Sequence, residues 1–500
     1  MKKYYIAILS VILCMLPPAI SAQSESRQLD RMIQQGMEDW HIPGLAAVVV
    51  KEGEVVFSEV YGVKEVQTGS EVNHETLFNM GSTTKAVVCM ALGILVDQGK
   101  LKWEDKVREH LPEFRLSDAY LTEEARVKDL LTHNLGMAGA DLLWVLDSTS
   151  TKETIHRFAM AKKAYPVRGG YQYNNLMYAI AGEVIRAVSG KPWTVFVKEH
   201  LFTPLEMTRT VAKASDIFAA GNYVTPYFYE ESQGFIEVPP NLSDQIGAAG
   251  MIWTCASDME NYLQMLVGGG VYKENRILKE ETFNYLFQPH ALLTKADFYP
   301  TTRLTQPHWM SYGLGWFQHD YRGRKLDFHT GSIGGLIAIA GVMRDANTAV
   351  YVLANRDHAE LRHAILYQAL DLWAFGDNPR DWNAEILSLY KGLEQRQDER
   401  NQKLLENRKM DAPTSLPLEA YTGTYEHPML GRVAIGLSSE GIRARFNDFV
   451  TFNMVHWHYD TFRTTPDNRY LWETNLVFNL GGDGEVKGMQ AFGEEFSKTE

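Results

Sequence analysis

The stretch Phe78-Asn79-Met80-Gly81-Ser82-Thr83-Thr84-Lys85 stands directly before a long apolar segment, and this junction decides the fold. Gly81, Ser82 and Thr83 are suited to the start of a helix, and Gly99 to its end. The pattern predicts that Ser82 opens a buried helix, where unpaired backbone N–H groups lie beside its hydroxyl. Apolar side chains recur after it at the spacing of a helix, at Val87, Met90, Ala91, Ile94 and Leu95.

Ser82 and Lys85 are three residues apart, which places both side chains on one face of the predicted helix. A serine hydroxyl is a poor nucleophile until a base takes its proton, and a desolvated lysine can be that base. A second copy of the spacing, Ser388-Leu389-Tyr390-Lys391, lies in a charged, helix-favouring segment and is interpreted as accidental. The setting of Ser82, rather than the spacing, favours it as a nucleophile.

Two further motifs carry side chains suited to catalysis. Tyr173-Asn174-Asn175 follows a glycine-rich turn and precedes an apolar helix, so Tyr173 is predicted to be a phenolate partner of Lys85. Asn175 is predicted to hold a substrate amide. His329-Thr330-Gly331-Ser332 follows a predicted strand and precedes two glycines, so its backbone is expected to lie against an extended substrate. Each motif alone is more often structural, but their order and spacing together indicate a site.

These stretches resemble the serine beta-lactamase and penicillin-binding-protein superfamily, in its class C-like branch of esterases, D-amino-acid peptidases and carboxypeptidases. The resemblance covers most of residues 30 to 360 in the family order. It implies an α/β (α+β) fold of the beta-lactamase/transpeptidase type, with an antiparallel sheet flanked by helices and an all-helical subdomain. Three more matching stretches are Leu130-Leu131-Thr132-His133, Ala248-Ala249-Gly250-Met251 and Tyr312-Gly313-Leu314-Gly315-Trp316.

The resemblance also implies roles for the matched residues. Ser82 would form an acyl-enzyme, and Lys85 and Tyr173 would transfer protons. The backbone N–H groups of Ser82 and Ser332 would form an oxyanion hole. The remaining substrate-binding residues would be Asn175, His329 and Gly331.

The chain departs from the family pattern at two places. Asn134-Leu135 stands where the family usually has Thr-Ser, so the local turn is expected to differ. His329 replaces the usual lysine, which turns a permanent cation into a switchable one. The activity is therefore expected to depend on pH near neutrality through the titration of His329.

The chain divides into four regions by composition and periodicity. Residues 1–22 have the features of a signal peptide: a basic start, an apolar run and a small residue at the expected cleavage site. The protein is therefore expected to be periplasmic or secreted. Residues 23–375 are the expected catalytic domain and 376–415 a helical linker. Residues 416–500 alternate with a period of two and predict a small antiparallel β-barrel. From Tyr421 to Tyr425 this tail resembles the lipocalin-like barrel often attached to such enzymes.

Charge and cysteine content exclude several classes of protein. The net charge of −13 argues against a nucleic-acid or anionic-membrane partner, and no later segment predicts a transmembrane helix. Cleavage would leave Cys89 and Cys255, too few for a disulfide framework.

Other catalytic and metal-binding motifs are absent or weak in the sequence. No phosphate loop and no Gly-x-Ser-x-Gly occurs, and no cofactor is implied. His456 and His458 make a candidate metal pair that is more often a surface feature, and residues 358–363 are interpreted as a solvated helix face.

The sequence predicts an exported serine hydrolase that acts on an ester or amide bond of a small molecule or peptide. An acyltransferase remains open, because an alcohol or amine can take the acyl group from an acyl-enzyme as water does. A non-catalytic penicillin-binding sensor is the third possibility. Aromatic residues of segments 223–229 and 287–309 are expected to line the cleft and to favour bulky or apolar acyl groups.

Overall fold

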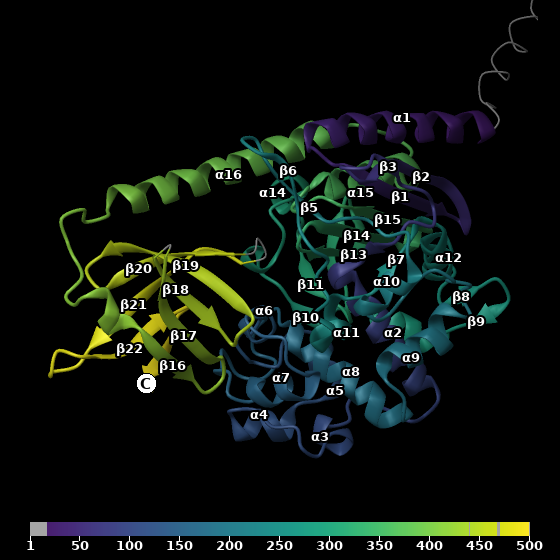
Figure 1. Cartoon of the computed structure of the whole chain (residues 1–500). Helices are drawn as coiled ribbons and strands as arrows, with labels where there is room; N and C mark the ends of the chain where they lie inside the picture. Colours follow the sequence, from purple (N-terminus) through teal and green to yellow (C-terminus); the bar gives the residue numbers. More distant parts are fainter. Residues whose placement is uncertain (1–17, 440, 468–470, 500) are drawn as a thin grey trace, which may run out of the picture.

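A computed structural model of the chain describes residues 18–439, 441–467 and 471–499 (Figure 1). Its centre is a nine-stranded antiparallel sheet. The strand β1 enters from the N-terminal end of the chain and pairs with the late strand β15 on one side and with β2 on the other. The mixed fold with both ends in one sheet is therefore confirmed. The strand order is β10 (Ala291–Leu292), β11 (Met310–Tyr312), β12 (Phe317–Tyr321), β13 (Arg324–Ile333), β14 (Leu336–Met343), β15 (Thr348–Ala354), β1 (Gly44–Lys51), β2 (Glu54–Glu65) and β3 (Ser70–Glu71).

Helices cover both faces of this sheet, which explains why β1, β14 and β15 are almost wholly buried apolar runs. One face carries α1 (Pro18–Asp39), α15 (Leu361–Leu370) and the start of α16 (Trp382–Glu406). The other face carries α12 (Ala256–Val267) and the turn η2 (Gly81–Thr83).

The predicted buried helix is present as α2 (Thr84–Asp97), preceded by η2. Every residue of α2 from Thr84 to Leu95 is buried, because α2 packs against α8 (Asn175–Ser189), α11 (Gly247–Gly250) and α13 (Glu280–Leu286). A helical layer surrounds α2 and α8 (Figure 1). Its other helices are α3 (Val107–His110), α4 (Ala119–Glu124), α5 (Val127–Leu131), α6 (Leu142–Val145), α7 (Thr151–Phe158) and α9 (Trp193–Val197).

Short elements complete the catalytic domain. Three two-stranded sheets pair β4 (Phe78–Asn79) with β7 (Trp253–Thr254), β5 (Tyr227–Glu230) with β6 (Gly234–Glu237), and β8 (Val271–Tyr272) with β9 (Asn275–Arg276). The remaining short helices are α10 (Ile217–Ala220) and α14 (Thr302–Thr305).

The C-terminal part of the chain is a closed barrel of eight strands, as the period of two predicts. The helix α16 connects it to the catalytic domain; its first turns bury Trp382 and Ile386, whereas Ser388 is exposed. The barrel strands are β16 (Gly423–His427), β17 (Gly431–Ser438), β18 (Gly441–Phe446), β19 (Val450–His458), β20 (Thr461–Pro466), β21 (Thr474–Leu480), β22 (Val486–Ala491) and β23 (Glu494–Lys498).

The predicted signal peptide lies outside the described residues except for residues 18–22, which begin α1. Among the residues that the structure describes, no helix is both long enough and apolar enough to cross a membrane. Cys89 and Cys255 are both free thiols in buried positions.

Candidate active site

Ser82 lies in η2, where the backbone comes into close contact with strand β13. Gly81 has a φ of +51°, and a Cβ atom on it would stand 2.6 Å from the backbone nitrogen of Ser332. A Cβ atom on Gly331 would stand 2.0 Å from the carbonyl oxygen of Met80. Only glycine fits at either position. The two glycines thus bring the backbone beside Ser82 against the backbone N–H of Ser332.

Lys85 is fully buried behind Ser82. Its Nζ lies 2.9 Å from Ser82 Oγ, and it donates to Asn175 Oδ1 and to the carbonyl oxygen of Ala249, each at 2.8 Å. Asn175 Oδ1 and the Ala249 oxygen only accept hydrogen bonds, so they hold two of the lysine hydrogens. The third position of Nζ is directed at Ser82. In the neutral amine this position is the lone pair, ready to accept the serine proton.

Burial lowers the pKa of Lys85 to about 7, because a desolvated ammonium is less stable than a neutral amine. The carboxylate of Asp141 opposes this shift by favouring the ammonium. A large fraction of Lys85 is therefore neutral at physiological pH, which a base requires.

Asn175 links Lys85 to Asp141. Its Oδ1 accepts from Lys85, and its Nδ2 donates to the two carboxylate oxygens of Asp141 at 3.1 and 3.3 Å. Asn174 caps the same helix, α8, by accepting from the backbone N–H of Leu176. The structure thus places Asn175 in contact with the base, and its predicted contact with a substrate amide stays a prediction. Asp141 could not be identified as a site residue from the sequence, because it belongs to no motif.

Tyr173 lies beside the same pair, with its ring centroid 4.8 Å from Lys85 Nζ. Its hydroxyl is buried and makes no hydrogen bond of normal geometry within the described residues. Burial raises the pKa of Tyr173 well above 10, although the nearby Ser82 hydroxyl opposes part of the rise. The prediction of a phenolate is therefore wrong, because a group with this pKa is a neutral phenol near pH 7.

His133 holds the segment that carries Tyr173. Its Nδ1 accepts from the backbone N–H of Asn174 at 3.1 Å, and its ring centroid lies 4.2 Å from that of Tyr173. It has a φ of +57°, in the turn where Asn134-Leu135 departs from the family pattern. This buried imidazole thereby positions Tyr173 and the start of α8 together.

His329 is brought to the site on β13, but not as a switchable cation. Its Nδ1 donates to the carbonyl oxygen of Thr330 at 2.6 Å, which leaves Nε2 to accept from the hydroxyl of Tyr312 at 3.0 Å. Burial, helped by the charge of Lys85, lowers the pKa of His329 to about 3. The expected charge change of His329 near neutrality is therefore wrong.

A buried ion pair supports the strand beside Ser82. Arg362 Nη1 donates to Ser332 Oγ at 2.8 Å and to the carbonyl oxygen of Gly331 at 2.5 Å. Its Nε and Nη2 bind both carboxylate oxygens of Glu360, at 3.0 and 2.8 Å. Glu360, Arg362 and His363 are all buried. The interpretation of this segment as a solvated helix face is therefore wrong.

A cavity of about 530 Å³ opens beside Ser82. Aromatic rings form much of its wall, and Phe298 and Tyr299 come from the segment 287–309 that was expected to line a cleft. The predicted Ser82, Tyr173, Asn175, His329 and Ser332 all reach it. The full lining is Ser82, Tyr171, Gln172, Tyr173, Asn175, Ala296, Asp297, Phe298, Tyr299, Pro300, Phe317, His329, Thr330 and Ser332.

Comparison with known families gives a match that spans most of the catalytic domain. The beta-lactamase family profile matches residues 29–372. The chain belongs to the beta-lactamase family. A second family profile matches residues 407–500 of this beta-lactamase family member, which include the barrel. It is described as a domain of unknown function (DUF3471).

Similar proteins include named hydrolases. The chain is 26% identical to the unguisins hydrolase ungD' of Aspergillus campestris over 81% of this chain and 76% of that protein. It is 24% identical to the protein flp of Staphylococcus aureus strain MW2 over 66% of this chain and 63% of that protein.

Solved structures share the fold over nearly the whole chain. The octameric penicillin-binding protein homologue from Pyrococcus abyssi has a TM-score of 0.61 at 19% identity, covering 94% of this chain and 99% of that one. SurE has a TM-score of 0.59 at 18% identity, covering 95% and 100%. These likenesses show the fold, while the family match and the named hydrolase among the relatives support a serine hydrolase of the beta-lactamase family.

Proposed function

We propose that the protein is an exported serine hydrolase that forms an acyl-enzyme at Ser82 and hydrolyses an ester or amide bond. The observation that carries this proposal is the fully buried Lys85 amine, with a pKa of about 7 and its free position directed at Ser82 Oγ 2.9 Å away. The basic and apolar start of residues 1–22 supports export.

In acylation, neutral Lys85 takes the proton of the Ser82 hydroxyl while Oγ forms a bond to the substrate carbonyl carbon. The backbone N–H groups of Ser82 and Ser332 hold the resulting oxyanion. The bond to the leaving group then breaks, and the leaving group takes a proton supplied from Lys85 through the Tyr173 phenol. In deacylation, Lys85 takes a proton from water while the water oxygen bonds to the ester carbon; the bond from that carbon to Ser82 Oγ then breaks, Oγ takes the proton from Lys85, and the acid leaves.

The rate should depend on pH through Lys85. We expect kcat/KM to rise with pH around a midpoint of about 7, because only the neutral amine accepts the serine proton. Asp141→Asn removes the charge that favours the ammonium, so the midpoint should move to lower pH. The measurement is the pH profile of kcat/KM for a chromogenic ester.

Asp147→Asn is the matched control, since Asp147 lies in the same region but pairs with Arg157 at 2.8 Å. Its profile should keep the wild-type midpoint. An unchanged midpoint in Asp141→Asn would show that Lys85 does not determine the pH dependence of kcat/KM.

The fate of the acyl group separates hydrolysis from the alternatives. Products should be the free acid and alcohol or amine, in amounts unaffected by added alcohol acceptors. A new ester formed from the added alcohol would identify an acyltransferase instead. Covalent labelling of Ser82 by a fluorophosphonate, without turnover of any ester, amide or beta-lactam, would identify a non-catalytic sensor.

A further inference from the structure

A second cavity, of about 590 Å³, adjoins the first at Ser332. Ser332 belongs to the walls of both cavities, and the next residues along the chain, Ile333 and Gly334, continue into the second. Half of its sixteen lining residues are apolar, and apolar atoms contribute most of its exposed surface. The apolar residues include Trp144, Val145, Phe228, Leu242, Ile333 and Phe449.

Phe449 comes from the C-terminal barrel, whereas the rest of this wall comes from the catalytic domain. It lies in the tight turn between β18 and β19, where Asn447 and Asp448 have φ values of 49° and 56°. Asparagine and aspartate tolerate this left-handed conformation best among residues with a side chain. The backbone N–H of Phe449 closes the turn by donating to Phe446 O at 2.8 Å. Half of Phe449 is nevertheless exposed.

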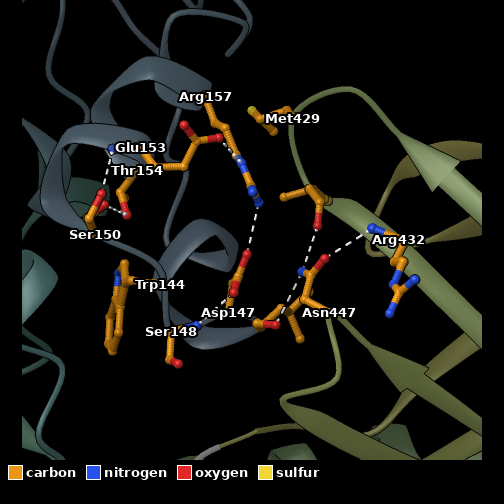
Figure 2. A network of polar contacts seen from close by, with 12 residues as sticks. Trp144, Asp147, Ser148, Ser150, Glu153, Thr154, Arg157, Met429, Arg432 and Asn447 are labelled. Atoms are coloured by element: carbon orange, nitrogen blue, oxygen red, sulfur yellow. Dashed lines mark hydrogen bonds and ion pairs between the residues drawn. The ribbon is translucent and has the colours of Figure 1, made fainter.

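Contacts of its neighbours hold this turn against the catalytic domain (Figure 2). The Nδ2 of Asn447 donates to the carbonyl oxygen of Leu430 at 2.8 Å, within the barrel, and to that of Leu146 at 3.3 Å, across the interface. Its Oδ1 accepts from the backbone N–H of Arg432 at 3.0 Å. The turn that carries Phe449 to the cavity wall is therefore tied to the catalytic domain through Asn447.

In the proposed mechanism the two cavities take different parts of the substrate. Tyr173 and His329 line the first cavity and are absent from the walls of the second. Because the proton for the leaving group comes from the Lys85–Tyr173 side, the leaving group lies in the first cavity. The acyl group then extends past the N–H of Ser332 toward Ile333 and the second cavity.

We propose that the second cavity binds an apolar part of the acyl group and that Phe449 is a specificity-determining residue supplied by the barrel. This inference rests on the proposed function. Its physical basis is the apolar surface of Phe449, which remains exposed until an apolar chain covers it.

The test compares two esters with the same leaving group, p-nitrophenyl acetate and p-nitrophenyl octanoate. Phe449→Ala should lower kcat/KM for the octanoate about tenfold and change that for the acetate by less than about twofold. Phe449→Leu, which keeps an apolar side chain, should retain most of the octanoate activity. Tyr459→Ala is the matched control, since Tyr459 is an exposed aromatic residue of the barrel outside both cavities, and both rates should stay at wild-type values.

Two results would overturn the inference: equal changes for both esters in Phe449→Ala, or a wild-type enzyme that shows no preference for the octanoate. Failure of the proposed function has a different signature. In that case Ser82→Ala would still hydrolyse both esters, whatever Phe449→Ala does.

Discussion

Replacing Ser82 by alanine should lower kcat/KM for ester or amide substrates by at least about a thousandfold. The substitution removes the oxygen at which Lys85 Nζ is directed from 2.9 Å, so the base loses its partner along with the nucleophile. The buried Lys85 would remain in place, held by Asn175 and Ala249. Steady-state kinetics measure the loss, and intact mass after fluorophosphonate treatment should show no adduct on the variant.

Ser388→Ala is the matched control, because Ser388 is also a serine three residues before a lysine. It is exposed, lies seven residues into the 25-residue helix α16, and does not line the first cavity. Its kinetics and its labelling should match those of the wild-type enzyme. Equal losses in Ser388→Ala and Ser82→Ala would refute the assignment of the nucleophile.

The second large effect is expected on stability. Arg362→Met should lower the free energy of unfolding by about 3–5 kcal/mol, because it leaves the carboxylate of Glu360 buried without a counter-charge. The same change removes the donor that holds Gly331 O and Ser332 Oγ, so activity should fall too. Urea denaturation at pH 7 measures the stability, and kcat measures the damage to the oxyanion hole.

A double variant separates charge burial from misfolding. Glu360→Gln combined with Arg362→Met leaves no unpaired charge, so most of the lost stability should return while the loss of kcat persists. Lys191→Met, which breaks the exposed pair with Glu199, should leave the free energy of unfolding nearly unchanged. A stability of Arg362→Met equal to that of the wild-type protein would contradict this account.

Much of the site was predictable because its residues sit at boundaries that the sequence marks. Ser82 follows a glycine and precedes a helical apolar pattern, and Asn175 begins α8 after a glycine-rich turn. His329 lies on a strand next to Gly331, where only glycine allows the backbone to touch Met80. Local patterns of this kind depend on neighbours in the chain, so a single sequence can reveal them.

The charge states and the supporting residues could not be predicted in the same way. The pKa values of Tyr173 and His329 depend on burial by segments distant in the chain. Burial keeps both side chains neutral near pH 7, whereas a phenolate and a titrating imidazole were expected. Asp141 and Arg362 act through contacts across long sequence separations. No spacing in the chain indicates that Arg362, on α15, lies beneath the end of β13.

The position of β1 inside the sheet has a consequence for when the active site can form. Val48 lies opposite both Ser58 and Tyr351, so β1 has one partner strand nearby in the chain and the other at the far end of the catalytic domain. Until β15 is available, one edge of β1 is an open template for mispairing. Pairing across so long a stretch of chain is slow. The active serine should accordingly appear only once the whole catalytic domain is present, rather than on a partly folded segment of it.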